Sequence, residues 1–253
     1  MKLEQKNKPD AGSGGALGAD WQLSLPPAVF ARWQWGLVAG LLLLGTGAYV
    51  FKAATGHGNL LGLLRLLDVG QEASLPSWFS TFNLLLASAL AALVWRLPTA
   101  GDEGRSGWAA TAALLLFMSL DEGAAIHEIL NDVQAALVQR GLSPDWFGSH
   151  PWLVLGAPLA LLVGALFLPF LWRMPRYLAG RLILAGGVFL GGAVGLEGAG
   201  ALMESAGISR DSLIYDLRRI GEEGLEMAGV VVLNLTLYAE LSRRAGRLSW
   251  LMR

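Results

Sequence analysis

Residues 152–172 read WLVLGAPLALLVGALFLPFLW, an apolar stretch that carries no charged side chain. A helix needs about 20 mainly apolar residues to cross the ~30 Å hydrocarbon core of a bilayer, and this stretch is long enough. It therefore predicts a membrane-spanning helix. Working outward in both directions, we find five further stretches of this kind, and they are residues 33–52, 77–96, 108–130, 178–204 and 222–242.

The composition of the whole chain agrees with a lipid environment. Of its 253 residues, 54% are hydrophobic and only 15% are charged, whereas soluble domains carry about 25% charged residues. The strands of a membrane β-barrel would alternate in polarity, and the apolar stretches do not. The sequence thus predicts an all-α fold, a polytopic membrane bundle of about six transmembrane helices.

Polar segments flank the predicted bundle at both ends of the chain. Residues 1–20 are polar and rich in glycine, unlike a signal peptide, which has a basic segment followed by an apolar core. We expect residues 1–30 to be a flexible cytoplasmic tail and residues 31–245 to form the six-helix transmembrane domain. Residues 246–253 are expected to be a basic C-terminal tail.

The distribution of basic residues predicts the orientation. About two thirds of the 19 Lys and Arg residues fall on one side of the membrane if both termini lie on that side, and the cytoplasmic side is normally the richer one. We therefore expect cytoplasmic termini and a multi-pass protein of the inner (plasma) membrane. The longer loops, residues 53–76, 131–151 and 205–221, then face outward. Residues 60–69 and 211–220 are expected to contain short helical segments.

Acidic side chains gather near the outer ends of three predicted spans. The third span ends in SLDEGAAIHE (119–128), the sixth begins EEGLEM (222–227), and the fifth carries Glu197 and Glu204. A charged carboxylate at the centre of a bilayer costs at least ~2.5–3.5 kcal/mol on insertion scales. A group of like charges therefore needs protons, basic partners or a metal cation.

Helical geometry predicts which acids share a face. Residues seven apart on a continuous helix lie on the same side, two turns apart. This spacing pairs Asp121 with Glu128 and Glu197 with Glu204. Each of these helices is therefore expected to present a stripe of carboxylates.

Other residues at these ends have a functional and a purely structural interpretation. Glu222 and Glu223 open the predicted sixth span, where the helix macrodipole favours negative charge, and this alone would explain them. Glu226 lies one turn further along. His127 is expected either to bind a metal or to hydrogen-bond a carboxylate.

Together these residues predict a carboxylate and histidine metal site near the outer membrane face. Four-helix di-iron and di-manganese proteins combine Glu residues with a Glu-x-x-His motif, but this chain lacks the motif and has only 3 histidines. An oxygen-rich site with one histidine suits divalent Fe, Mn, Ca or Mg, with Zn as a further candidate. The predicted ligands are Asp121, Glu122, His127, Glu128, Glu197, Glu204, Glu222 and Glu226.

Small residues predict how the helices pack. Gly187, Gly191 and Gly195 recur every four residues in the fifth span, and Gly36 and Gly40 form a weaker repeat in the first. A face without side chains lets two membrane helices approach closely. These glycines are expected to form packing surfaces.

Three segments are distinctive in combination: LDVGQEASLPSWFST (67–81), SLDEGAAIHE (119–128) and EEGLEMAG (222–229). In this order they resemble a family of bacterial multi-pass membrane proteins that are usually described only as hypothetical. The resemblance covers residues 33–242 or thereabouts. It implies that the SLDExxxxHE and EExxEM segments are shared family features, and it implies no activity, cofactor or substrate.

The sequence leaves three functions open, and it does not decide whether the protein is an enzyme. The first is a metalloprotein, either an oxidoreductase or a hydrolase acting on a lipid-soluble substrate. The second is a non-catalytic accessory subunit of a larger membrane complex, which suits the glycine faces and the 10 tryptophans. The third is a cation or proton carrier, although carriers usually bind near the midplane.

Charge and cysteine content restrict the partners. The net charge of −1 gives no reason to expect nucleic acid, and the absence of cysteine excludes thiolate metal sites and thiol nucleophiles. We expect membrane lipid as a partner, with other membrane subunits under the accessory-subunit hypothesis. No nucleophile elbow, phosphate-binding loop or dinucleotide fingerprint occurs in the sequence.

Overall fold

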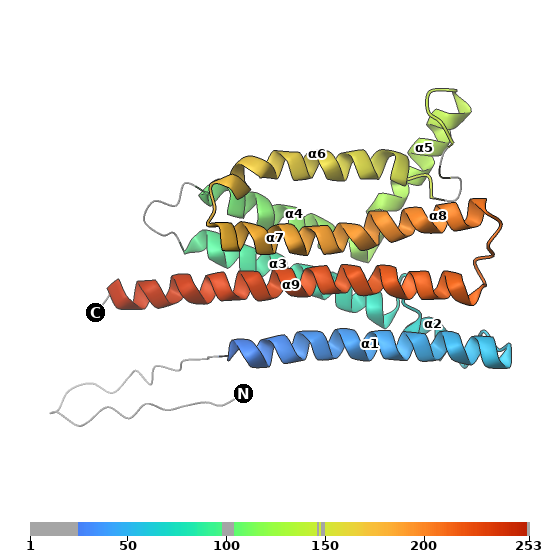
Figure 1. The fold of residues 1–253 in the computed structure, drawn as a ribbon, viewed down its shortest axis with the longest axis horizontal. Coiled ribbons are helices and arrows are strands. Elements are labelled where there is room, and N and C mark those ends of the chain that lie inside the picture. The colour runs from blue at the N-terminus through green and yellow to red at the C-terminus, as the bar shows by residue number, and fades with distance from the viewer. Residues whose placement is uncertain (1–24, 98–103, 146, 148–149, 252–253) are drawn as a thin grey trace.

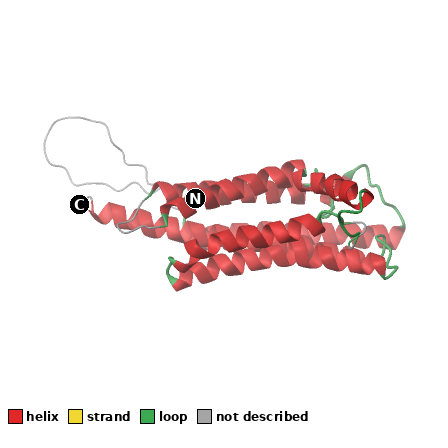
Figure 2. Cartoon of the chain, turned by 90° about the horizontal axis from the view of Figure 1, so that it is seen from above, coloured by secondary structure: helices red, strands yellow, loops and turns green. Residues whose placement is uncertain are grey.

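The structure is a computed structural model that describes residues 25–97, 104–145, 147 and 150–251. Every regular element among these residues is a helix, and the longer connecting loops gather at one end (Figure 2). The elements are α1 (Pro27–Thr55), α2 (Leu63–Leu67), α3 (Leu75–Arg96), α4 (Arg105–Ala124), η1 (Ile126–Glu128), α5 (Ile129–Gln139), α6 (Leu153–Trp172), α7 (Arg176–Leu190), η2 (Gly191–Leu196), α8 (Glu197–Ser205) and α9 (Leu213–Leu251).

Five helical segments of the described chain are long and apolar enough to cross a membrane. They are α1, α3, α6, the continuous run from Arg176 to Ser205 and α9, and the bent pair of α4 and α5 makes a sixth if it counts as one span. The predicted all-α membrane bundle is therefore confirmed. Helix α1 begins and α9 ends at the same end of the bundle (Figure 1). We call the opposite end the outer end, after the orientation that the sequence predicts.

Local sequence explains how individual helices begin and which faces they expose. The hydroxyl of Ser74 accepts a hydrogen bond from the backbone N–H of Ser77 (3.3 Å), and Pro76 stands in the first turn of α3; both features favour a helix start. Helix α6 leaves large leucines uncovered, including Leu161 (73% exposed) and Leu166 (70%). Lipid is the natural environment for such a face.

Helix α9 is the centre of the bundle. It packs against α1, α3 and α7 (Figure 1). The main apolar core joins α3 to α4 and α9 through Leu84, Val94, Trp108 and Leu237, all of them buried. This core fixes the depth of α3 and α4 relative to α9 and so sets where their polar residues lie.

The inner end of α9 is fastened to α3 by a buried charge. Arg244 donates its Nη1 hydrogens to the backbone oxygens of Val94 and Leu97, at 3.1 Å each, and its Nε to Glu240 at 2.8 Å. The oxygens belong to the last turn of α3, where carbonyl groups lack helical partners. Arg244 therefore caps α3 and closes this end of the bundle.

The third predicted span, residues 108–130, is not one continuous helix, and in this detail the prediction is wrong. Helix α4 ends at Ala124, because Ala125 adopts a left-handed backbone conformation with φ of 51°. The chain then bends by 75° into η1 and α5, and α5 projects from the bundle (Figure 1). Most of α5 lies in the segment predicted as the loop 131–151.

Several smaller predictions have clear outcomes. The short helix expected within residues 60–69 is confirmed as α2, and helical structure does begin before the sixth span, at Leu213. Helix α9 also continues to Leu251, through most of the segment predicted as a basic C-terminal tail. Residues 1–24, which make up most of the predicted N-terminal tail, lie outside the described residues.

Candidate cation site

Five glutamates from three helical segments interact electrostatically near the outer end. The charges of Glu122, Glu197 and Glu222 all act on both Glu223 and Glu226. Glu122 lies near the end of α4, Glu197 is the first residue of α8, and the other three belong to α9. We call these five half-buried residues the acidic set. Since distant parts of the sequence supply its members, the fold brings them together.

A close helix contact places Glu222 and Glu226 against the fifth span. A Cβ atom added to Gly192 would lie 2.6 Å from the backbone oxygen of Glu222 and 2.8 Å from Cγ of Glu226. Only glycine permits this approach. Gly192 belongs to η2, a π-helical segment that directly precedes Glu197, and π-helical turns often occur at functional sites.

The glycines predicted to pack are not the ones that do so. A Cβ at Gly187 would meet nothing within 4 Å, and at Gly191 and Gly195 the nearest atoms would be 4.0 and 3.9 Å away. Gly36 and Gly40 are equally open. Within the described chain, these glycines therefore do not make the close helix contacts that were predicted, and packing against another subunit stays a prediction. A π-helical turn holds more residues than an α-helical one, so the glycine repeat changes direction within η2 and Gly192 faces α9 instead.

The bend after α4 changes the expected pairing of Asp121 and Glu128. Asp121 accepts a hydrogen bond from the backbone N–H of His127 (2.6 Å), and its second oxygen lies 3.3 Å from Nδ1 of the same histidine. Asp121 thus holds the bend together. Glu128 follows the bend and is exposed, so the stripe predicted for a continuous helix does not exist.

An aromatic side chain connects His127 to Glu197. The indole Nε1 of Trp152 donates a hydrogen bond to Oε1 of Glu197 at 2.7 Å. The ring of His127 packs edge-on against that of Trp152, with 5.6 Å between the ring centroids. These contacts orient Glu197 and place the histidine beside the acidic set.

One member of the acidic set has a basic partner. Nη1 of Arg218 lies 2.8 Å from a carboxylate oxygen of Glu222 and donates to the backbone oxygen of Leu196 at 2.9 Å. The side chains of Arg218 and Glu222 are only 7% and 12% exposed. Because α9 begins at Leu213, Glu222 and Glu223 lie well inside the helix, and the macrodipole explanation offered for them is wrong.

Three members of the acidic set lack such a partner. Within the described residues, no hydrogen bond or ion pair reaches the side chain of Glu122, Glu223 or Glu226. The same part of the chain contains no group of three or more acidic or histidine side chains that is already arranged to hold a metal ion. The carboxylates are near one another without forming a finished coordination shell.

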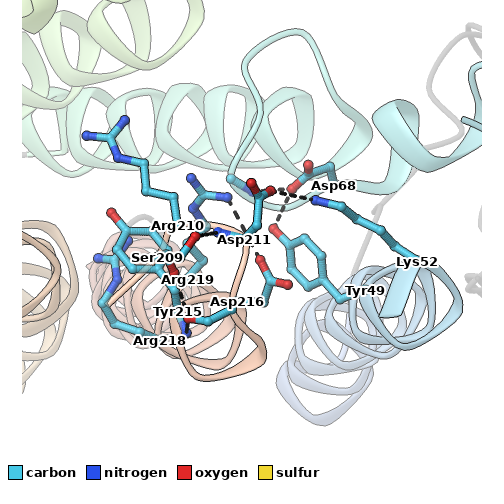
Figure 3. A network of polar contacts seen from close by, with 12 residues as sticks. Tyr49, Lys52, Asp68, Ser209, Arg210, Asp211, Tyr215, Asp216, Arg218 and Arg219 are labelled. Carbon is cyan, nitrogen blue, oxygen red and sulfur yellow. Dashed lines mark hydrogen bonds and ion pairs between the residues drawn. The ribbon is translucent and has the colours of Figure 1, made fainter. Parts of the chain in front are cut away.

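Glu204 belongs to a different group of contacts. It accepts hydrogen bonds from the hydroxyl of Tyr215 (2.6 Å) and from Nε of Arg210 (2.8 Å). Figure 3 shows Tyr215 beside Arg218 and Arg219, whose guanidinium carbons lie 4.6 and 4.9 Å from its ring centroid. The structure therefore holds Glu204 in a basic and aromatic network rather than beside Glu226.

The same network reaches α1 and the first outer loop (Figure 3). The hydroxyl of Tyr49 donates to Asp68, and Lys52 lies 3.2 Å from Asp211. The first contact joins α1 to the first outer loop, and the second joins the end of α1 to the loop before α9. Both contacts hold the loops of the outer end against α1, near the acidic set.

Two titratable groups in the outer loops are shifted by their surroundings. Burial, together with Arg210 and the arginines of α9, lowers the pKa of His150, although the nearby Glu204 opposes the shift. Partial burial and the charges of Glu128 and Asp121 raise the pKa of Glu72. The outer loops therefore carry both positive and negative fields beside the acidic set.

The predicted ligands thus fall into three classes. Glu122, Glu197, Glu222 and Glu226 interact in the acidic set, Asp121 and His127 lie at its edge, and Glu128 and Glu204 lie in other surroundings. Glu223 was not among the predicted ligands, although its place in EExxEM was a signal. The supporting roles of Trp152 and Arg218 depend on folding and had no such signal.

Comparison with known proteins identifies a family. A family model described as Domain of unknown function (DUF8692) matches residues 35–241, which include the whole acidic set. No curated protein and no solved structure matches the chain. The match confirms one part of the resemblance inferred from the sequence, namely that the chain belongs to a family without an assigned function. The bacterial origin of that family and its sequence motifs stay predictions. Because the match covers most of the 253 residues, the chain belongs to the DUF8692 family.

Proposed function

We propose that this membrane protein binds a divalent metal cation in the acidic set. The observation that carries the proposal is that, in the described part of the chain, Glu122, Glu223 and Glu226 have neither a hydrogen bond nor an ion pair. They nevertheless lie in a helix bundle with lipid-compatible faces. Carboxylates in such a place need neutralisation from outside the chain.

Electrostatics favours a cation with more than one charge. The charges of Glu122 and Glu223 both act on Glu226. Protons neutralise carboxylates one at a time, whereas one divalent ion neutralises two at once and removes their mutual repulsion. Metal binding would accordingly release protons.

The other two members of the acidic set support the ligands. Glu222 is already paired with Arg218, and Glu197 is held by Trp152. Their contacts keep two charges neutralised or oriented and leave Glu122, Glu223 and Glu226 as the ligands. Residues that contact a metal site without binding the metal typically tune its affinity for the metal.

Binding requires small side-chain movements. No three side chains of the described chain are already arranged for a metal, but glutamate side chains have several rotatable bonds and can turn inward. An all-oxygen set of ligands suits Mn²⁺, Mg²⁺ or Ca²⁺, and addition of the nearby His127 would favour Fe²⁺ or Zn²⁺. The proposal concerns binding. The oxidoreductase, hydrolase, accessory-subunit and carrier roles stay predictions.

The proposal is tested by titrating the purified full-length chain in detergent with Mn²⁺ and measuring bound metal and released protons. The wild type is expected to bind Mn²⁺ with proton release, and Glu226→Gln or Glu223→Gln to weaken binding by about tenfold or more. Asp132→Asn removes an exposed carboxylate from α5 and is the matched control. A wild type that binds none of Mn²⁺, Mg²⁺, Ca²⁺, Fe²⁺ or Zn²⁺ would show that the acidic set holds protons only.

A further inference from the structure

Two buried asparagines meet between α3 and α9. Nδ2 of Asn234 donates to Oδ1 and to the backbone oxygen of Asn83, at 2.7 and 3.1 Å. Asn83 is 3% exposed and Asn234 is fully buried. Their remaining amide atoms, Nδ2 of Asn83 and Oδ1 of Asn234, are buried and have no hydrogen-bond partner among the described residues. The pair is therefore only half satisfied.

Two further buried polar atoms lie near this depth. Ser80 precedes Asn83 by one helical turn, and its hydroxyl has no partner in the described chain. On α1, Val38 packs in one cluster with Val231 of α9. Helices α1 and α9 run in opposite directions, so Gln34 lies about one turn from Val38 toward the inner end, and Asn234 lies about one turn from Val231 in the same direction. Gln34 and Asn234 are therefore at a similar depth.

Oε1 of Gln34 is likewise buried without a partner in the described structure. The four side chains are Gln34 (7% exposed), Ser80 (8%), Asn83 (3%) and Asn234 (0%). Burying such an atom without a partner is unfavourable, because the hydrogen bonds that it makes with water in the unfolded chain are lost. Lipid tails cannot supply the missing hydrogen bonds, so the partners must come from inside the bundle.

The unsatisfied atoms have complementary hydrogen-bonding character. Nδ2 of Asn83 is a donor, whereas Oδ1 of Asn234 and Oε1 of Gln34 are acceptors, and the hydroxyl of Ser80 can be either. Water both donates and accepts, and buried waters typically make two to four bonds to such groups. A metal ion would repel the amide donor, and an apolar ligand would leave every atom unpaired.

We propose that ordered water occupies this polar site between α3, α9 and α1, in the interior of the bundle. The inference goes beyond metal binding, because the site contains no acidic residue and lies deeper. Glu223 and Asn234 are eleven residues apart, so they share one face of α9 at about three turns' distance. The water extends the polar interior inward from the acidic set.

Proton-detected solid-state NMR of the full-length chain in lipid bilayers tests this proposal. Magnetisation that starts on water is expected to reach the side-chain amide of Asn83 severalfold faster than the backbone amide of Ala87. Ala87 lies one turn away on α3 and is fully buried in the apolar core. Equal rates at the two positions would mean that the site is dry and would overturn the proposal.

A double variant, Asn83→Leu with Asn234→Leu, provides the matched test. Replacing both partners by apolar side chains of similar shape is nearly neutral for stability, so the variant is expected to fold. In the wild type, the backbone amides at positions 83 and 234 lie beside the proposed water and should also receive magnetisation from water faster than the backbone amide of Ala87. The double variant should lose this difference. Rapid transfer that persists would show that the amides do not bind the water. Metal binding is measured separately, so failure of either proposal leaves the other standing.

Discussion

The two ends of α9 hold glutamates in opposite circumstances. Near the inner end, Glu240 is 3% exposed and accepts hydrogen bonds from Arg243 and Arg244, both at 2.8 Å from the Nε atoms. Near the outer end, Glu223 and Glu226 have no hydrogen bond or ion pair within the described structure. The comparison shows that this chain can supply arginines to a buried glutamate. At the outer end Arg218 pairs with Glu222, but no arginine reaches Glu223 or Glu226 within the described structure, and the proposed metal cation would take that place.

The largest effect on stability is expected from neutralising one glutamate at each end of α9 and comparing the two variants. Glu240→Gln removes a buried carboxylate that accepts a hydrogen bond from Arg244, which is 4% exposed, and should lower the free energy of unfolding by about 3–5 kcal/mol. Glu226→Gln removes repulsion and should leave metal-free stability unchanged or higher. Unfolding titrations of both variants in detergent provide the measurement. Similar destabilisation by the two changes would erase the contrast between the ends.

A smaller loss is expected where the fifth span contacts α9. Gly192→Ala places a methyl group 2.6 Å from the backbone oxygen of Glu222, and such overpacking costs about 1–3 kcal/mol. Gly187→Ala is the control, because a Cβ there meets nothing within 4 Å. The melting temperature of the first variant should fall and that of the second should not. A drop for Gly187→Ala alone would restore the packing face predicted from sequence.

Trp152 donates a hydrogen bond to Glu197. The variant Trp152→Phe keeps an aromatic ring but removes this hydrogen bond to a carboxylate, and it should lower the free energy of unfolding by about 1–2 kcal/mol. The same substitution at Trp33, which is 67% exposed on α1, should have little effect. Thermal unfolding compares the two variants. Equal losses would indicate that the tryptophans act only through their bulk.

The smallest effect concerns pH. Since the pKa of His150 in the folded protein is lowered below the ordinary value for histidine, about 6.5, the unfolded chain binds more protons just below that pH. Stability should therefore fall as the pH is lowered from 6.5 toward the folded pKa. A histidine NMR titration should give a midpoint below 6.5 for His150. The variant His150→Gln should lose this part of the pH dependence. A midpoint above the ordinary value for histidine would reverse the sign of the expected change in stability with pH.

Much of the fold follows from the sequence because apolar length is a local property. Helices α1, α3 and α6 lie where uninterrupted apolar stretches predicted them. Helix α9 begins at Leu213, nine residues before the apolar span predicted from Glu222 and within the segment 211–220 where helical structure was expected. The charged side chains of Arg218 and Glu222 mask that start, and their pairing becomes visible only in the folded chain.

The candidate site was predictable in its residue types and less so in its geometry. Acid-rich segments pointed to Glu122, Glu197, Glu222 and Glu226, which do interact. The bend at Ala125 and the π-helical turn of η2 could not be anticipated, because each shifts helical phase through backbone conformation rather than composition. These two shifts explain why the face-sharing argument failed for Asp121 and Glu128 and for the glycine repeat.

The most direct measurement is an anomalous difference map from crystals of the full-length chain grown with Mn²⁺. A peak enclosed by the carboxylates of Glu122, Glu223 and Glu226 is the result expected. If manganese appears only on exposed acids such as Asp132, or nowhere at all, the outer end of α9 is not a metal site and its difference from the inner end has another cause.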